Sequence, residues 1–371
     1  MAPAHRRRGQ PLPDALARRT EQSIQEMKRP PASDNMSMAM SRTPYRVSFF
    51  GGGTDYPEWY REHGGSVLSM AINRYCYIVG RHLPPFFATR HRVVWSHIET
   101  VNSISEILHP AVRAGLQYME FDNDRGVEIH HQGDLPARSG IGSSSSFSVG
   151  LINVLHAMRG QTINKRDLAN AAIHLERDIL QETVGCQDQV ASAYGGLNVI
   201  SFGKDGAIDV VPLDLSGQNQ RKLEDWLLLF YTGTTRLSST IAKLLVSNFA
   251  AKSKHLQRMH AMVDPAAKQL RMGDLESFGQ LLNEAWQLKR QLSDGVTTTS
   301  IDDVYAAALS AGALGGKLLG AGGAGFMAFI VPPEKQPRVR AALSHLLHVP
   351  AGIDFTGSTI VYRQLETLPQ S

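Results

Sequence analysis

The stretch that decides the fold of this chain is Leu135-Pro-Ala-Arg-Ser-Gly-Ile-Gly-Ser-Ser-Ser-Ser146. The segment before it, 127–131, has the composition of a strand, and the apolar residues after it follow the period of a helix with one buried face. Glycines let the backbone approach a ligand closely, and the first N–H groups of a helix are unpaired at the positive end of its dipole. A strand, a glycine loop and a serine-rich helix start together predict a phosphate-binding loop.

The alternative is that the serines cap an ordinary helix, but a cap needs one serine and this segment has four in a row. Serine hydroxyls add short hydrogen-bond donors, and one of them can ligate Mg²⁺. The residues that we expect to bind a phosphate-bearing cofactor are Pro136, Arg138, Ser139, Gly140, Ile141, Gly142, Ser143, Ser144 and Ser145.

The last glycine-rich stretch in the chain, which we call the third glycine stretch, is Lys317-Leu-Leu-Gly-Ala-Gly-Gly-Ala-Gly325. It contains the spacing G-x-G-x-x-G. The dinucleotide-binding fingerprint needs a strand before that spacing and a helix after it, whereas here a helical pattern lies upstream and a strand follows at 326–331. It is not a Walker A loop either, because Lys317 precedes the glycines. A tight turn needs only two residues. The extra glycines therefore predict backbone close to a ligand, at Gly320, Gly322 and Gly323.

The first glycine-rich stretch in the chain is Arg46-Val-Ser-Phe-Phe-Gly-Gly-Gly-Thr-Asp-Tyr56. It puts an arginine at the start of a strand and an aspartate just past its end. That aspartate has two interpretations. It is a simple turn residue after the glycines, or its carboxylate accepts hydrogen bonds from two hydroxyls of a sugar. In the second interpretation the substrate contacts come from Gly52, Gly53, Thr54 and Asp55.

The composition is that of a soluble globular protein. The 371 residues suffice for two domains, 42% of them are hydrophobic and 19% are charged. No apolar run approaches the roughly 20 residues that span a bilayer, so no membrane segment is expected. The two cysteines, Cys76 and Cys186, belong to no C-x-x-C pair, so we expect free thiols in a reducing compartment, the cytoplasm.

The net charge of +4 arises mainly from the first 40 residues, which hold seven Lys or Arg against four Asp or Glu. The rest of the chain is nearly neutral, so no nucleic-acid-binding surface is expected. Residues 1–40 contain several prolines and few large apolar residues, and they lack the apolar core of a signal peptide. We expect them to be a disordered basic extension, with a functional basic arm as the alternative.

After residue 43, helix and strand patterns alternate and several strands are adjacent in sequence, which predicts an α+β protein whose two lobes meet near residues 200–220. The predicted strands are 45–50, 75–83, 93–96, 127–131, 197–202, 208–212, 226–231, 317–319, 326–331 and 358–363. The predicted helices are 110–121, 164–184, most of 238–291, 302–313 and 336–347. A further helix is predicted to start within the serine run 143–146, and its apolar positions continue to Met158.

The three glycine-rich stretches, in this order, resemble the motifs of the GHMP kinases, the family of galactokinase, homoserine kinase, mevalonate kinase and phosphomevalonate kinase. The first quoted stretch is close to the family's phosphate loop, P-x-x-x-G-[IL]-G-S-S, and L-G-A-G-G-A-G-F matches its third motif. The resemblance spans residues 43–363. It implies a two-lobed fold: after the extension 1–40 come an N-terminal lobe like ribosomal protein S5 over 41–210 and a ferredoxin-like C-terminal lobe over 211–371.

The stretch from Thr43 to Tyr56 narrows the resemblance. It aligns without gaps on the galactokinase pattern A-P-G-R-V-N-x-x-G-E-H-T-D-Y, except that Gly52 and Gly53 replace the Glu and His that help to hold galactose. The form R-[IV]-S-F-x-G-G-G-T-D is similar to D-glycero-D-manno-heptose 7-phosphate kinases and to the kinase domain of fucokinases, and the chain length favours the former. The resemblance implies phosphorylation of the anomeric hydroxyl of that heptose phosphate, in the synthesis of nucleotide-activated heptose for capsule or lipopolysaccharide.

The resemblance also implies ATP and Mg²⁺ as cofactors, and it implies the catalytic residues. Asp188 matches the aspartate that takes the proton of the attacking hydroxyl, and Arg46 matches the arginine that faces it. Glu176, twelve residues before Asp188, matches the glutamate that ligates Mg²⁺ together with a serine of the phosphate loop. Ser144 is the best match for that serine, followed by Ser143 and Ser145.

A substrate that carries a phosphate needs a second cationic pocket, because a buried dianion without partners is costly. Arg236 lies in a turn before a predicted helix and is one expected contact; the others considered are Arg74, Arg138 and Lys317. The expected partners are therefore ATP and a phosphosugar, and a homo-oligomer stays open.

Three alternatives remain for the function. The chain is a fucokinase- or galactokinase-like kinase of an unphosphorylated sugar, a decarboxylase-type member acting on a diphosphate, or a non-catalytic binding protein with the same fold. The last is expected to have lost the acidic residues, whereas Glu176 and Asp188 are both present.

Overall fold

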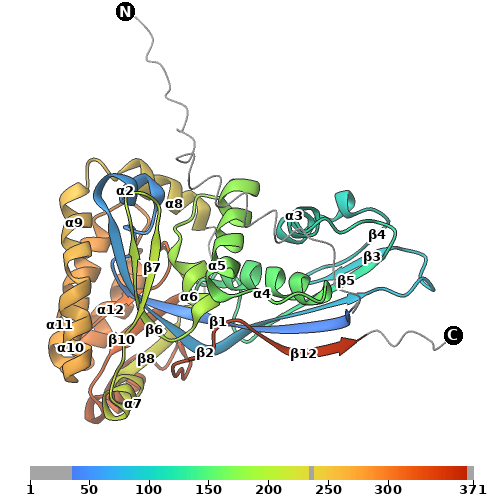
Figure 1. Cartoon of the computed structure of the whole chain (residues 1–371). Coiled ribbons are helices and arrows are strands. Elements are labelled where there is room, and N and C mark those ends of the chain that lie inside the picture. The colour runs from blue at the N-terminus through green and yellow to red at the C-terminus, as the bar shows by residue number, and fades with distance from the viewer. Residues whose placement is uncertain (1–35, 234–237, 366–371) are drawn as a thin grey trace, which may run out of the picture.

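The computed structural model of the chain describes residues 36–233 and 238–365 (Figure 1). Most of the predicted extension, 1–35, therefore lies outside the described residues, and so does Arg236. Residues 36–40 were also assigned to the extension, and that part of the prediction is wrong. They form the start of strand β1 (Met36–Phe50), where Ala39 is fully buried between two neighbouring strands.

The larger sheet is built on two long antiparallel strands, β1 and β2 (Gly65–His82). The strand order is β12-β1-β2-β5-β3-β4, and the first half of β2 also pairs with β6, which pairs with β7. All of these pairs are antiparallel except β3 with β5. The remaining strands are β3 (His91–Val94), β4 (Ile98–Val101), β5 (Val127–Gly133), β6 (Leu197–Phe202), β7 (Ile208–Pro212) and β12 (Thr359–Leu365).

One face of this sheet is covered by a layer of helices, of which α4 directly follows the phosphate loop. Helix α4 (Ser143–Met158) lies along β1 and β2 (Figure 1), and it is buried from Ser145 to its end. The approach is close because small residues meet there: a side chain at Gly150 would come within 2.9 Å of the Thr43 hydroxyl. The other helices of this layer are α3 (Pro110–Tyr118), α5 (Lys165–Ile173) and α6 (Gln187–Tyr194), and α2 (Pro57–His63) lies between β1 and β2 in the chain.

The second sheet has four strands in the order β11-β8-β10-β9, all antiparallel. They are β8 (Leu227–Tyr231), β9 (Gly315–Leu318), β10 (Phe326–Ile330) and β11 (Leu347–His348). The helices of this half are α7 (Gly217–Trp226), α8 (Ser238–Ser247), α9 (Ser253–Ala261), α10 (Val263–Met272), α11 (Leu275–Arg290), α12 (Thr299–Ala311) and α13 (Gln336–Ala342). The predicted α+β class is thus confirmed.

The two sheets meet across helix α11. Its Phe278 packs edge-on against Phe49 and Phe50 at the end of β1, with ring centroids 5.4 Å and 5.3 Å apart. The end of β1 is therefore covered on both faces, which explains its continuous apolar character. The site residues of β1 are consequently held between the two halves of the molecule.

The chain crosses back at its end, because β12 pairs with β1 at the edge of the first sheet. The expected C-terminal lobe over 211–371 thus contributes its last strand to the sheet of the first lobe. The boundary between the two lobes near residue 210 stays a prediction. Strand β12 belongs to the first sheet although it follows that boundary in the sequence.

Several predicted elements end elsewhere than expected. The helix predicted over 164–184 stops being α-helical after Ile173, passes through a π-helical turn (His174–Ile179) and ends there. Trp226, predicted to start a strand, is instead the last residue of α7, and α13 stops at Ala342. Helices α2, α6 and α7 were not predicted, because each is short and lacks a long apolar period. Among the described residues, no helix has the length and apolar character to cross a membrane.

Candidate active site

The phosphate loop runs from β5 to α4, and two glycines bend it. Gly140 and Gly142 have φ of +82° and +75°, in the left-handed region that favours glycine. A side chain at Gly142 would come within 3.2 Å of the Arg46 side chain and 3.4 Å of a carboxylate oxygen of Asp188. The loop therefore closes directly over these two residues.

The four serines that open α4 have different partners. Ser143 accepts a hydrogen bond from the Arg138 N–H (3.0 Å), and Ser146 donates to the carbonyl of Pro44 (2.9 Å). Ser145 donates to a carboxylate oxygen of Glu176 (3.0 Å). Ser144 is exposed, and its hydroxyl has no partner among the described residues. Ser144 is therefore the serine of this run whose hydroxyl is open to a ligand.

The third glycine stretch packs against the phosphate loop. The N–H of Phe326 donates to the carbonyl of Ser139 (3.0 Å), and a side chain at Gly325 would come within 2.1 Å of that carbonyl oxygen. A side chain at Gly320 would come within 2.5 Å of the Gly140 Cα. Glycines at 320 and 325 are thus needed because the two loops touch there. The sequence had predicted only that the glycines bring the backbone close to a ligand.

Arg46 of β1 and Asp188 of α6 form a bidentate ion pair. The guanidinium donates from Nε to Oδ1 (2.7 Å) and from Nη2 to Oδ2 (2.5 Å), and its Nη1 donates to the carbonyl of Gly140 (2.7 Å). Arg46 is buried, whereas the Asp188 side chain is 23% exposed. Such a paired guanidinium stabilises the charged carboxylate and fixes its orientation. The sequence resemblance predicted that Arg46 faces Asp188, and the two residues are in contact in the structure.

Asp55 lies next to this pair but points into the protein. Its carboxylate accepts hydrogen bonds from the N–H groups of Gly53 (3.0 Å) and Gln187 (3.3 Å), and it is 1% exposed. Burial, and next to it the charge of Asp188, raises the pKa of Asp55 to about 6. The chain leaves room for it at Gly185, where any side chain would come within 1.9 Å of the carboxylate.

The other residues of the Gly52–Asp55 turn are arranged differently. Thr54 is fully buried, and its hydroxyl donates to the carbonyls of Gly51 (2.8 Å) and Ser66 (3.0 Å). Gly52 is partly exposed, and its nearest side chain is that of Gln187, 3.8 Å from the position of a Cβ. Gln187 was not predicted, because a glutamine before the matched aspartate has no pattern of its own.

Glu176 lies in the π-helical turn and is fully buried. One carboxylate oxygen accepts hydrogen bonds from Ser145 (3.0 Å) and Gln189 (2.5 Å), while the other has no hydrogen-bond partner. Burial raises the pKa of Glu176 to about 7. A buried carboxylate oxygen without a partner is costly, and π-helical turns are frequent at functional sites.

These residues fit a magnesium ion. Mg²⁺ in kinase sites takes one or two carboxylates together with phosphate oxygens and water. Glu176 supplies a carboxylate with an unpaired oxygen, and Ser145 supplies a hydroxyl that hydrogen-bonds this carboxylate. Ser144, which precedes Ser145 in the chain, supplies an exposed hydroxyl. Among residues 36–233 and 238–365, no group of three or more His, Cys, Asp or Glu gathers as a metal site. Any ion here would therefore depend on the nucleotide for further ligands.

Two lysines border the site. Lys317 is 4% exposed, and its ammonium donates to the carbonyl of Phe49 (2.9 Å). Lys289, in the last turn of α11, is partly buried and donates to the carbonyls of Leu318 (2.8 Å) and Gly320 (2.6 Å). Lys317 had been considered from the sequence. Lys289 had not, because a basic residue in the last turn of an amphipathic helix normally favours the helix dipole at the surface.

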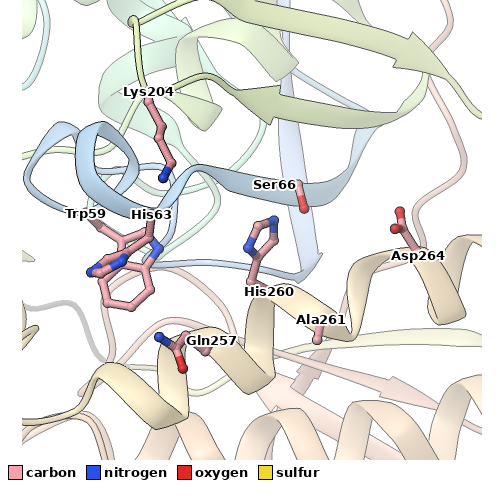
Figure 2. A pocket seen from close by; sticks show the side chains of 8 residues that line it. All are labelled: Trp59, His63, Ser66, Lys204, Gln257, His260, Ala261 and Asp264. Atoms are coloured by element: carbon pink, nitrogen blue, oxygen red, sulfur yellow. The ribbon is translucent and has the colours of Figure 1, made fainter.

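A cavity of about 450 Å³ lies away from the phosphate loop, between α2, the start of β2, the β6–β7 turn and the helices α9 and α10 (Figure 2). Lys204 reaches over it from the turn, and His260 projects into it from α9. None of the predicted site residues lines this cavity; its lining residues are Trp59, His63, Ser66, Lys204, Gln257, His260, Ala261 and Asp264.

The chain matches two family profiles, GHMP kinases N terminal domain over residues 105–196 and GHMP kinases C terminal over residues 266–348. The first profile includes the phosphate loop, Glu176 and Asp188, and the second includes Lys289 and the third glycine stretch. Both halves of the expected two-lobed fold are thus found, in the expected order.

Two curated relatives illustrate the similarity. A D-glycero-alpha-D-manno-heptose 7-phosphate kinase from Campylobacter jejuni is 28% identical over 326 residues, which are 83% of this chain and 94% of the relative. A bifunctional fucokinase/GDP-fucose pyrophosphorylase from Arabidopsis thaliana is 26% identical over 328 residues, 81% of this chain but only 30% of that longer protein.

Among solved structures, a D-glycero-D-manno-heptose 1-phosphate kinase from Bacteroides thetaiotaomicron superimposes with a TM-score of 0.71. The two chains are 22% identical, and the match covers 87% of this chain and 99% of the other. At this identity the superposition establishes a shared fold.

Proposed function

Because the chain belongs to the GHMP kinases and is a sugar kinase, we propose that it transfers the γ-phosphoryl group of ATP to the anomeric (C1) hydroxyl of D-glycero-D-manno-heptose 7-phosphate. The observation that carries this proposal is the bidentate pair of Arg46 and Asp188 directly beneath the phosphate loop. A general base, a phosphate cradle and a buried cation meet there, which is what phosphoryl transfer needs. The relative from Campylobacter jejuni, matched over nearly its whole length, supports the heptose phosphate as substrate.

In this proposal the oxygen of the C1 hydroxyl attacks the γ-phosphorus. The bond from that phosphorus to the β–γ bridging oxygen breaks, so ADP leaves and the heptose 1,7-bisphosphate forms. The hydroxyl proton passes to the Asp188 carboxylate, which is the exposed member of the ion pair. Arg46 fixes the orientation of that carboxylate through two hydrogen bonds. Asp55 then positions the sugar through the turn that it stabilises from within, at Gly52 and Gly53.

The phosphates of ATP would be held by the open N–H groups at the start of α4 and by the Ser144 hydroxyl. Mg²⁺ would be held by Glu176 and a serine hydroxyl, and when bound it neutralises charge on the transferred group. Gly322 and Gly323 are proposed to leave the backbone of the third glycine stretch close to the substrate. Arg236, the other expected contact, lies outside the described residues.

We also propose a cytoplasmic location and a place in the synthesis of nucleotide-activated heptose for surface polysaccharide. Cys76 and Cys186 are both free and buried, which suits a reducing compartment.

An ADP-release assay with Mg-ATP and a panel of acceptors tests the substrate. The panel contains mannose, galactose, fucose, sedoheptulose 7-phosphate and D-glycero-D-manno-heptose 7-phosphate. We expect the highest kcat/KM with the heptose phosphate. A preference for fucose would contradict this and would favour a fucokinase activity, as in the Arabidopsis relative.

A further inference from the structure

Two ammonium groups stand at the junction of the two sheets without a counter-ion. Lys317 on β9 donates to the carbonyl of Phe49, and Lys289 on α11 donates to the carbonyls of Leu318 and Gly320. Neither lysine forms an ion pair with a carboxylate in the part of the chain that the structure describes. Both are therefore held by neutral carbonyl groups alone.

The nearby carboxylates are already engaged. Asp188 is paired with Arg46 through both of its oxygens, and Asp55 accepts backbone hydrogen bonds on both of its oxygens. With Arg46, the two lysines make three cations against two carboxylates, one of which has a raised pKa. When both lysines are protonated, the site thus carries an excess of positive charge.

The ammonium groups also retain open hydrogen-bond donors. Each lysine has three N–H donors; Lys289 uses two of them and Lys317 uses one. When both side chains are protonated, one donor on Lys289 and two on Lys317 therefore have no protein acceptor among the described residues.

Such an arrangement is unfavourable in the free protein. Burial, followed by the charge of Arg46, lowers the pKa of Lys317 to about 7. Burial, followed by the charges of Lys317 and Arg46, lowers the pKa of Lys289 well below its usual value. A bound anion would reverse both effects, because it supplies the missing counter-charge.

The position of the lysines favours the acceptor sugar over the nucleotide. Lys317 donates a hydrogen bond to the carbonyl of Phe49, two residues before the glycine turn that we propose binds the sugar. The charge of Asp55, in that turn, acts on Lys317 and favours its protonated form. For the phosphates of the nucleotide, the start of α4 is already proposed as the binding site.

We infer that Lys289 and Lys317 bind the phosphate group already carried by the acceptor sugar. This inference rests on the proposed function, because it requires an anionic acceptor. It makes the lysines specificity-determining residues, and it makes the charge of the acceptor the feature that they recognise.

Steady-state kinetics of Lys289→Met and Lys317→Met in the full chain test the inference, with D-glycero-D-manno-heptose 7-phosphate and the unphosphorylated heptose as paired acceptors. We expect kcat/KM to fall by roughly 30-fold or more with the phosphorylated sugar, mainly through KM, and to change little with the unphosphorylated sugar. Lys254→Met removes an exposed lysine of α9 and is the matched control. Equal losses with both sugars, or a raised KM for ATP, would overturn the inference.

A second measurement is independent of turnover. Inorganic phosphate is expected to raise the melting temperature of the wild type and of Lys254→Met more than that of either site variant. Without phosphate, the two site variants should melt no lower than the wild type, because an uncompensated charge has been removed. If the wild type phosphorylates no sugar phosphate but shows this stabilisation, the proposed function fails, the role of the lysines toward an acceptor fails with it, and only anion binding by the two lysines stands. If it prefers the heptose phosphate while the variants keep that preference, the inference fails and the function stands.

Discussion

Single residues decide whether the proposed chemistry is available, and Asp188 is the first of them. Its carboxylate is both fixed and accessible: Arg46 holds it through two hydrogen bonds, yet 23% of its side chain is exposed. A carboxylate used only for stability would gain nothing from that exposure.

The substitution Asp188→Asn removes the proton acceptor and keeps a side chain of the same shape beside Arg46. We expect kcat to fall by about 10²–10⁴-fold, the usual contribution of a general base. ATP affinity, measured by calorimetry with the Mg²⁺ complex, should change little, because the phosphate loop is untouched. Near-normal turnover in this variant would refute the assignment of Asp188 as the base.

Glu176 provides a test at the same scale that does not depend on activity. Burial raises its pKa from the usual 4.5 to about 7, so the folded protein holds this proton more tightly than the unfolded chain. The stability from this group is therefore complete below about pH 4.5 and is lost as the pH rises through about 7.

In Glu176→Gln this dependence is absent. We expect the free energy of unfolding of the wild type, relative to the variant, to fall by on the order of 3 kcal/mol between pH 4.5 and pH 8. Urea unfolding without nucleotide or metal measures it, and Asp55 contributes equally to both proteins. Mg-ATP should reduce the difference if Glu176 ligates the ion; a flat difference across this range would contradict the buried, protonated carboxyl.

At the scale of elements, the phosphate loop and the third glycine stretch form one unit. They touch through backbone atoms, from Phe326 to Ser139 and from Gly320 to Gly140. The conformation of the loop that is proposed to hold ATP is consequently set by a turn about 180 residues later in the chain.

Gly325→Ala tests this contact, with Gly295→Ala as the control. Both glycines have φ above +80°, so alanine is strained at either position by about 1 kcal/mol. Only at Gly325 does the added methyl group meet backbone, 2.1 Å from the Ser139 carbonyl oxygen, whereas nothing lies within 4 Å at Gly295. We expect Gly325→Ala alone to weaken ATP binding, by calorimetry, beyond the shared loss of thermal stability. Equal ATP affinity in the two variants would show that the loops are independent.

For the whole molecule, the return of the chain to its first sheet is the main feature. Strand β12 covers the edge of β1 from Met38 to Arg42, and Ser358 just before it hydrogen-bonds Thr43 (2.8 Å). The last residues described therefore help to hold the strand that carries Arg46.

A chain that ends at Ser358 should lose stability by several kcal/mol, because the hydrogen bonds of β12 are lost and the edge of β1 becomes exposed. A chain that ends at Leu365 is the control. Thermal unfolding of the two proteins gives the comparison, and equal melting temperatures would mean that β12 is dispensable.

The sequence by itself determined the classes of elements and the identity of the loops. Strands 197–202 and 208–212 were predicted at their observed ends, and the helix predicted to start within 143–146 begins at Ser143, because apolar period and turn residues are local signals. The motif order indicated the family, and with it the pairing of Arg46 and Asp188.

The tertiary structure alone decided how these parts are used. It placed Ser145 against Glu176, turned Asp55 into the protein, explained Gly320 and Gly325 by loop contact, and brought Lys289 to the site. No local pattern encodes these facts, because each depends on the approach of segments far apart in the chain. Such approaches follow from strand register and side-chain packing, which short-range periodicity does not specify.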